Sequence, residues 1–218
     1  MNTQTLRNTL RAAALCGVAL LVTTGCDKKA NNSINFQSAI NTYYTAHPAC
    51  IWDTAKKFPV QANTSDDSKT SNYDALVDQG LLLRTTAEKK IIIISKQVNN
   101  YDLSDQGRAA WTPDPSQPGF GNFCYGHRAV SSIDGSTPTT DAVGATTQIS
   151  YHYTFTGAPA WATAAETQTA YPQIRTNLAA PQVGQATLTN TANGWAVSSA
   201  PGSNPGRRVT NADGSIVQ

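Results

Sequence analysis

Two short motifs that mirror one another hold the residues best suited to chemistry. His47 and Cys50 belong to HPAC, Cys124 and His127 belong to CYGH, and 73 residues separate the two cysteines. Two thiolates with two imidazoles suit tetrahedral Zn²⁺, whereas two thiols in an oxidising compartment are most simply a disulfide. Because the spacing is not that of a familiar zinc finger, the sequence favours a Cys50–Cys124 disulfide. A zinc site made of all four residues, and two separate thiols, are the alternatives.

The compartment is indicated by the start of the chain. Arg7 and Arg11 precede an apolar run from Ala12 to Val22, and no acidic residue occurs in this stretch. The pattern is typical of a secretory signal. The run has eleven residues, and a bilayer crossing needs roughly 20 apolar residues, so a permanent transmembrane helix is disfavoured. The run closes with Val22-Thr23-Thr24-Gly25-Cys26.

This closing segment resembles the lipobox of bacterial lipoprotein precursors, although Thr23 stands where that family usually has Leu. The resemblance implies that the signal peptide, residues 1–25, is removed and that Cys26 carries the lipid. Several acyl chains anchor a protein stably, so the membrane itself is an expected partner, through the lipid anchor. Asp27 resembles the signal that retains such proteins in the inner membrane, but Lys28 weakens it, so the periplasmic face of the inner membrane is slightly favoured over the outer membrane.

Net charge argues against nucleic acid as a partner. Removal of residues 1–25 takes away Arg7 and Arg11 but no acid, so 16 basic and 14 acidic residues become 14 of each. Nucleic-acid binding draws most of its affinity from neutralised phosphates. A neutral chain without a basic half gives that function no support.

A change in composition predicts two modules. Residues 26–115 carry 20 charged side chains, whereas residues 116–218 carry 8. The stretch 112–121 is rich in Pro and Gly, which is typical of a link. The predicted organisation is a linker at 26–33, an α+β module at 34–115, a second module at 116–199, and a disordered tail at 200–218, where Gly, Asn, Ser and Pro accumulate without apolar periodicity.

In the first module we expect two helices and a hairpin. Phe36, Ile40 and Tyr44 recur at helical spacing up to His47, which precedes a proline and so lies at a helix end. A second helix is expected at 72–79, capped by Ser71 and ended by Gly80. Strands are then predicted at 81–85 and 91–94 around a charged turn, TAEKK. The four isoleucines of the second strand indicate burial.

The segments YDALVDQGLL and YDLSDQGRAAW, with the hairpin between them, are similar to the winged-helix pattern over residues 73–111. The resemblance implies a winged-helix-like topology. It does not bring DNA binding with it, because the helix in question displays Asp74 and Asp78 and no basic residue, and fold does not fix function.

The second module is predicted to be β-β-α-β-β. Residues 122–133 and 146–157 alternate as strands do, a helical stretch follows from Pro159, and Asn193-Gly194 marks a hairpin turn. We expect an antiparallel sheet with this helix across one face, so the whole chain is α+β. Trp161 and Trp195 would be core residues between helix and sheet.

No enzyme motif with specific spacing occurs in the chain. G-x-S-x-G, H-E-x-x-H, a P-loop and G-x-G-x-x-G after a strand are all absent. The leading hypothesis is a non-enzymatic envelope binding or accessory module without a cofactor, whose further partner is an envelope protein. One alternative is an envelope hydrolase in which His127 or His152 meets a Ser or an acid; the other is a periplasmic metal-binding protein.

Overall fold

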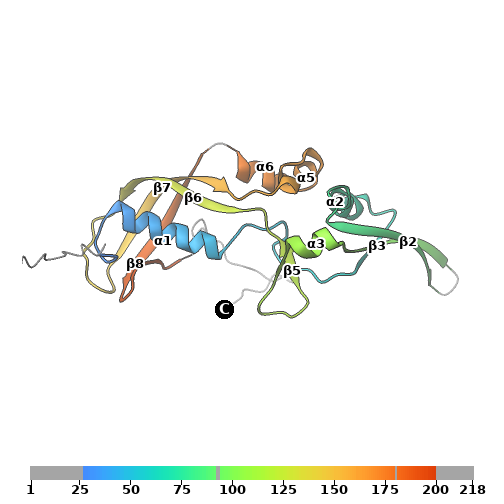
Figure 1. The fold of residues 1–218 in the computed structure, drawn as a ribbon, viewed down its shortest axis with the longest axis horizontal. Helices are drawn as coiled ribbons and strands as arrows, with labels where there is room; N and C mark the ends of the chain where they lie inside the picture. The colour runs from blue at the N-terminus through green and yellow to red at the C-terminus, as the bar shows by residue number, and fades with distance from the viewer. Residues whose placement is uncertain (1–26, 92–93, 180, 200–218) are drawn as a thin grey trace, which may run out of the picture.

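A computed structural model describes residues 27–91, 94–179 and 181–199. The predicted signal peptide, Cys26 and the predicted tail lie outside these residues. The architecture is α+β, as predicted, and the molecule is elongated (Figure 1). Its helices are α1 (Ser33–Ala46), α2 (Asp67–Asp78), α3 (Asp105–Ala110), α4 (Ala160–Thr163), α5 (Ala165–Ala170) and α6 (Pro172–Leu178). Its strands are β1 (Val60–Asn63), β2 (Leu82–Ile91), β3 (Ile94–Leu103), β4 (Trp111–Pro113), β5 (Gly121–Phe123), β6 (His127–Ser136), β7 (Thr146–Thr156), β8 (Gln182–Thr191) and β9 (Gly194–Val197).

The larger sheet is antiparallel and has the order β6-β7-β8-β9. Along β7, Ile149, Tyr151 and Tyr153 are buried and the residues between them are more exposed, as strand alternation requires. The covering helix is α1, whose Phe36 packs edge-on against Trp195 at 5.0 Å between ring centroids. The expectation that the helix after Pro159 covers this sheet is therefore wrong. Alternation identifies a buried face, but it does not say which helix covers it.

Helix α1 also supplies hydrogen-bond partners to backbone groups at the edge of the larger sheet. Among the described strands, none pairs with the outer side of β6. There Val130 N donates to Asn41 Oδ1 at 2.8 Å, and Gln37 Nε2 donates to the Val130 carbonyl at 2.8 Å. Two side chains of α1 thus replace the ladder bonds that an edge strand lacks.

The smaller sheet is antiparallel with the order β1-β3-β2 and packs against α2. Helix α2 starts earlier than predicted, because its N-cap is Asp66, whose side chain accepts from Lys69 N, and not Ser71. Gly80 ends it with φ of 71°, as predicted. Both β2 and β3 extend to the pair Ile91 and Ile94.

That register corrects the predicted hairpin. The segment TAEKK, residues 86–90, belongs to β2, where Thr86 pairs with Asn99 and Ala87 pairs with Val98. Its charged side chains suit an exposed strand as well as a turn, so polarity alone misplaced the turn. Ile92 and Ile93 lie outside the described residues. The predicted link at 112–121 falls largely in a hairpin, in which β4 pairs with β5.

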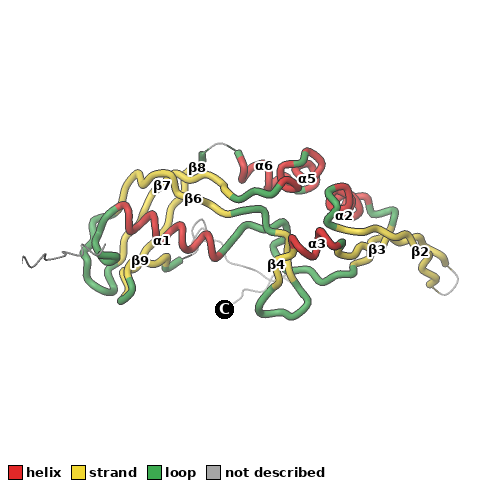
Figure 2. The backbone as a smooth tube through the Cα atoms, viewed as in Figure 1, coloured by secondary structure: helices red, strands yellow, loops and turns green. Residues whose placement is uncertain are grey.

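The buried residues form two clusters. The large-sheet core, between α1 and the larger sheet, contains Phe36, Ile40, Tyr44, Val130, Ile149, Tyr151, Tyr153, Ala186, Leu188 and Trp195. The small-sheet core contains Ile51, Ala62, Leu76, Leu81, Leu82, Tyr101, Phe123, Tyr125, Trp161, Ala162, Tyr171 and Ile174. Trp161 and Trp195 are both buried, as predicted, but in different cores. Each core draws on residues from both sides of position 115, and Figure 2 shows α5 and α6 beyond the end of the larger sheet, toward α2.

Candidate functional site

Cys50 and Cys124 form the predicted disulfide. The two segments around it run antiparallel, because Ile51 N donates to the Phe123 carbonyl at 3.0 Å and Tyr125 N donates to the Ala49 carbonyl at 2.8 Å. The cysteines are 74 positions apart, and closing a loop of this length stabilises a fold by about 4 to 5 kcal/mol in the chain-entropy view. The bond joins the segment after α1 to the segment before β6.

Neither histidine of the mirrored motifs approaches the disulfide as a ligand. His47 stacks on Tyr43 with ring centroids 4.2 Å apart, and its Nδ1 lies 2.8 Å from the Tyr43 carbonyl oxygen. His127 is the first residue of β6 and pairs with Thr156 of β7. Within residues 27–91, 94–179 and 181–199 no group of three or more His, Cys, Asp or Glu residues is arranged to hold a metal. The zinc alternative also needs two free thiolates, and the disulfide uses both.

His152 contacts an acid on the outward face of the larger sheet. Its Nδ1 lies 2.8 Å from both carboxylate oxygens of Asp134, and Ser132 Oγ donates to Asp134 Oδ1 at 3.3 Å. His152 was a candidate from the sequence, but Asp134 was not identified there as its partner. A Ser-His-Asp triad needs the hydroxyl on the imidazole and the imidazole on the carboxylate. Of these two contacts, Ser132, His152 and Asp134 make only the second.

A half-buried arginine between α1 and the larger sheet escaped the sequence analysis. The Arg128 guanidinium carbon lies 5.0 Å from the ring centroid of Tyr44 and 4.7 Å from that of Tyr153. Arg128 also donates to the Tyr44 hydroxyl at 2.9 Å, and that hydroxyl lies 2.8 Å from the Tyr151 hydroxyl. Burial raises the pKa of Tyr44 and Tyr151, so both rings stay neutral at physiological pH. The cluster fastens α1 to the sheet by stacking on a cation.

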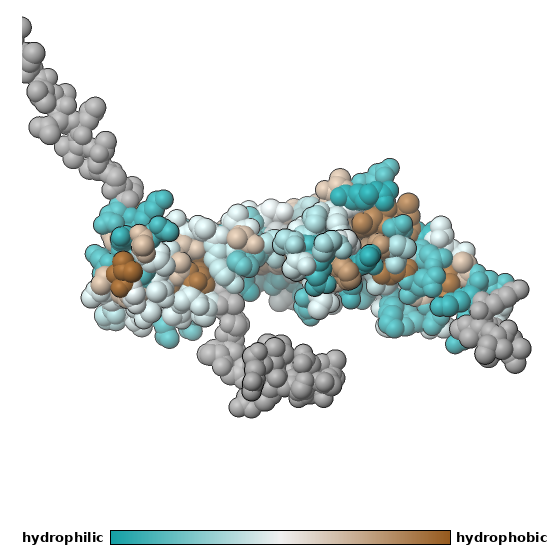
Figure 3. All heavy atoms as spheres, turned by 90° about the horizontal axis from the view of Figure 1, so that it is seen from below, coloured by the Kyte–Doolittle hydropathy of each residue, from teal (hydrophilic) through white to brown (hydrophobic). Residues whose placement is uncertain are grey.

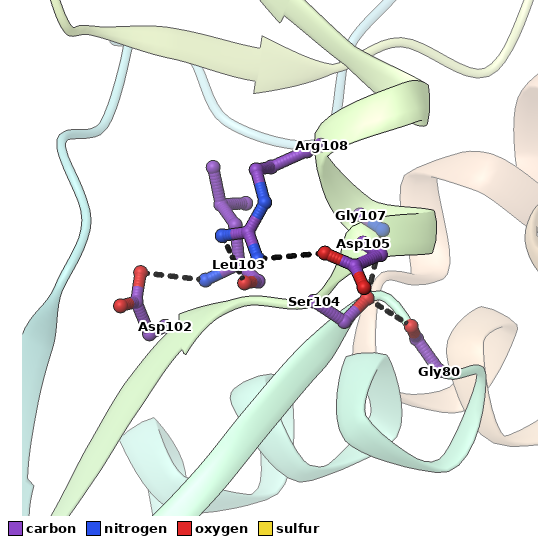
Figure 4. A network of polar contacts seen from close by, with 7 residues as sticks. All are labelled: Gly80, Asp102, Leu103, Ser104, Asp105, Gly107 and Arg108. Atoms are coloured by element: carbon purple, nitrogen blue, oxygen red, sulfur yellow. Dashed lines mark hydrogen bonds and ion pairs between the residues drawn. The ribbon is translucent and has the colours of Figure 1, made fainter.

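The winged-helix-like motifs meet in a polar network at the start of α3 (Figure 4). Ser104 caps α3 by accepting from Gly107 N at 2.8 Å, and its hydroxyl donates to the Gly80 carbonyl. A Cβ at Gly107 would overlap the Leu81 carbonyl oxygen. Arg108 closes the network by pairing with Asp105 at 2.9 Å. The motif residues thus join the end of α2 to the start of α3, and the winged-helix topology itself stays a prediction.

Helix α2 carries an acid, Asp74, whose partners lie on the neighbouring sheet. Asp74 Oδ1 lies 2.9 Å from Arg84 and accepts from the Tyr101 hydroxyl at 2.9 Å. Lys69, which the shorter predicted helix left out, pairs with Asp66 at 2.9 Å. Asp74 and Lys69 are therefore paired within the fold.

The first described residues are fastened to one end of the larger sheet. The Lys29 carbonyl accepts from Asn190 Nδ2 and from Trp195 Nε1, both at 3.1 Å. Asn190 Nδ2 also donates to the Asp141 carbonyl at 3.0 Å. We call Lys29, Asn190, Trp195 and Asp141 the Lys29 clamp. Residues 26–33 were expected to be a linker, because their polar or small side chains carry no signal of these distant bonds.

Comparisons with protein-family models, with curated proteins and with solved structures find no match. Among the described helices, none has the length and apolarity that crossing a membrane requires. The surface in Figure 3 is mostly hydrophilic or neutral, with hydrophobic residues in separate small groups.

Proposed function

We propose that this protein is an envelope lipoprotein, anchored by Cys26 and acting as a non-enzymatic binding or accessory module. The observation that carries the proposal is Val22-Thr23-Thr24-Gly25-Cys26, which follows a basic start and an apolar run. The anchor faces the periplasm, and Asp27 slightly favours the inner membrane. The neutral charge of residues 26–218 supports a protein or lipid surface as partner rather than nucleic acid.

The contacts of the first described residues support an anchoring role. Asp27 follows Cys26 directly, and the Lys29 clamp ties the chain two residues later to a buried asparagine and a buried tryptophan. A lipid on Cys26 would thus be connected to the folded protein through a short, hydrogen-bonded segment and not through a flexible linker.

Replacing the lipid-bearing cysteine tests the anchor. A Cys26→Ser variant lacks the thiol to which the lipid is attached, so we expect the protein to be lost from the membrane fraction. Cys16→Ser is the matched control, because Cys16 lies within the apolar run of the signal, and its variant should stay in the membrane fraction. The mass of the purified mature chain should show loss of residues 1–25 and gain of acyl groups. Equal membrane retention of both variants would overturn the proposal.

An envelope hydrolase is the second candidate, because His152 contacts Asp134. Purified protein would be assayed on fluorogenic esters and on peptidoglycan. Activity that His152→Ala abolishes and His47→Ala leaves intact would favour this candidate. We expect no such activity, since the hydroxyl of Ser132 is bonded to the carboxylate of Asp134.

A periplasmic metal-binding role is checked by zinc content and thiol alkylation with and without reductant. We expect both thiols to be protected from alkylation until reductant is added, because they are joined.

The binding role is tested by crosslinking in native membranes followed by pull-down. We expect one envelope protein to be captured by the wild type and also by His152→Ala. Capture of no specific protein by either would speak against a binding module.

A further inference from the structure

We propose that the end of the larger sheet that carries the Lys29 clamp rests on the lipid surface, so that the molecule stands with its smaller sheet directed away from the membrane. The inference depends on the proposed lipidation of Cys26. Lipidation alone places the protein at the membrane. The inference states in addition which surface meets the lipid and in which direction the rest of the protein is presented.

The distance along the chain from the lipid to the fold is short. Lys29 is three residues after Cys26, and an extended chain covers at most about 3.5 Å per residue, so the clamp lies within roughly 10 Å of the acylated residue. The headgroup layer on each side of a bilayer is about 5 to 8 Å thick. A cysteine whose thiol carries diacylglycerol lies in that layer. The clamp must therefore lie in or directly above the headgroups.

The chain between anchor and sheet cannot swing freely. The Lys29 carbonyl accepts two hydrogen bonds, and a Cβ on Gly194 would come within 2.8 Å of the Lys28 carbonyl oxygen. Asn31 N donates to Asp141 Oδ1 at 2.6 Å, and Asn31 Nδ2 donates to the Thr139 carbonyl at 3.1 Å. These bonds span the turn between β8 and β9 and the loop between β6 and β7. The anchor therefore fixes the orientation of the sheet and not only its distance from the membrane.

The loop between β6 and β7 presents an apolar side chain at this end. Gly144 N donates to the Asn190 carbonyl at 2.8 Å, which holds the loop next to the clamp. Val143, the preceding residue, is 63% exposed, and within the described part of the chain few large apolar side chains are exposed to this extent. Burial of a valine side chain in the interface is favourable, and although its contribution is small beside that of the acyl chains, it is sufficient to bias the tilt.

Charge at this end neither attracts nor repels an anionic surface. Asp27 and Asp141 are exposed, as is Lys28, while Lys29 is half-buried, so two acidic and two basic side chains balance. The orientation is then set by the lipid on Cys26, the clamp and Val143, and it should persist at high salt.

The opposite end of the molecule is the hairpin of β2 and β3. In Figure 1 the first described residues, in blue, lie at the left end and this hairpin lies at the right end. Each of the two strands has 10 residues. A strand of that length spans about 33 Å. The smaller sheet would thus be presented far from the membrane, where it can reach a partner in the periplasm.

A fluorophore at two valines of equal exposure tests the orientation. Val143→Cys and Val183→Cys are matched, since Val143 is 63% and Val183 is 64% exposed, and Val183 lies on β8 away from the clamp. The full lipidated protein carries an environment-sensitive dye on the new thiol, and it is reconstituted into vesicles of phosphatidylethanolamine and phosphatidylglycerol with spin-labelled lipids. We expect loss of emission and a blue shift at position 143 and neither change at position 183, at low and at high salt.

The outcomes separate this inference from the proposal on which it rests. If the protein fails to float with the vesicles, the lipid anchor is absent and both proposals are overturned. If it floats but the dye at position 143 is not quenched, or both positions are quenched equally, only the orientation is overturned. Unchanged circular dichroism of both variants verifies that the labelled proteins are folded.

Discussion

Among the glycines that the structure describes, Gly107 has the least room for a side chain. The Leu81 carbonyl oxygen occupies the space of a Cβ at this residue. We expect Gly107→Ala to lower the free energy of unfolding by about 2 to 3 kcal/mol, because rigid backbone must move apart. Gly135→Ala is the matched control, since a Cβ there meets nothing within 4 Å, and its effect should stay within about 0.5 kcal/mol. Urea unfolding of both variants measures the difference, and equal effects would show that the contact between α3 and Leu81 is not rigid.

Buried tyrosines make the fold sensitive to alkaline pH. Burial raises the pKa of Tyr44, Tyr125 and Tyr151 above the ordinary value of 10.0. Above that pH the unfolded chain releases these protons while the folded chain retains them, so the stability is complete below pH 10 and declines as the pH rises further. We expect the urea midpoint to fall between pH 8 and pH 11. Tyr151→Phe should fall less over this interval, because one ionisable group is removed; an equal fall in wild type and variant would contradict the assignment.

Apart from the two cysteines, the residues that fasten distant segments could not be identified from the sequence. The pairing of Cys50 with Cys124 was predictable, because few thiols are available and the expected compartment oxidises them. Arg128 gave no such signal, since its partner Tyr44 lies 84 positions away and an isolated arginine on a strand looks solvated. Asn190 likewise resembles a turn residue, yet it bridges Lys29 and Asp141. A polar residue that bonds to remote backbone is invisible to local patterns.

Among the elements, those with local signals were predictable and their partners were not. The apolar stripe of α1, the alternation of β7 and the turn at Gly194 all reflect periodicity or φ, and each is found in the structure. The length of β2 was underestimated, because a charged exposed strand lacks alternation. Which helix covers the larger sheet depends on the path of the chain between α1 and β6, and no window of sequence contains that information.

The bond between α1 and the edge of β6 yields a prediction for this pair of elements. Asn41→Ala leaves the backbone N–H of the buried Val130 without the acceptor it has in the structure. An unsatisfied buried donor costs about 1 to 3 kcal/mol, so the free energy of unfolding should fall by that amount. Ser38→Ala on the exposed side of the same helix is the control and should change little. A similar small effect from both variants in urea unfolding would mean that water replaces Asn41 at this edge.

For the whole molecule, the decisive property is that the two cores are built from alternating parts of the chain. Residues 36–44 enter the large-sheet core, residues 51–125 enter the small-sheet core, and residues 130–153 return to the first. Trp161 and Ile174 then complete the small-sheet core before residues 186–195 complete the large-sheet core. The disulfide links the two ends of the first segment of the small-sheet core, since Cys50 directly precedes Ile51 and Cys124 directly precedes Tyr125. A division at position 115 follows the change in charge density but cuts through both cores.

This interleaving predicts that neither half folds alone. A fragment of residues 26–115 keeps Phe36, Ile40 and Tyr44 but lacks the sheet that buries them, and it loses Phe123 and Trp161 from the other core. We expect this fragment and the fragment 116–199 to lack dispersed amide signals in NMR spectra, whereas residues 26–199 unfold in one transition by calorimetry. Mixing the two fragments under oxidising conditions should restore dispersion, because the disulfide and both cores can then form between them. A folded 26–115 fragment, or two separate calorimetric transitions, would instead establish independent modules that merely share contacts.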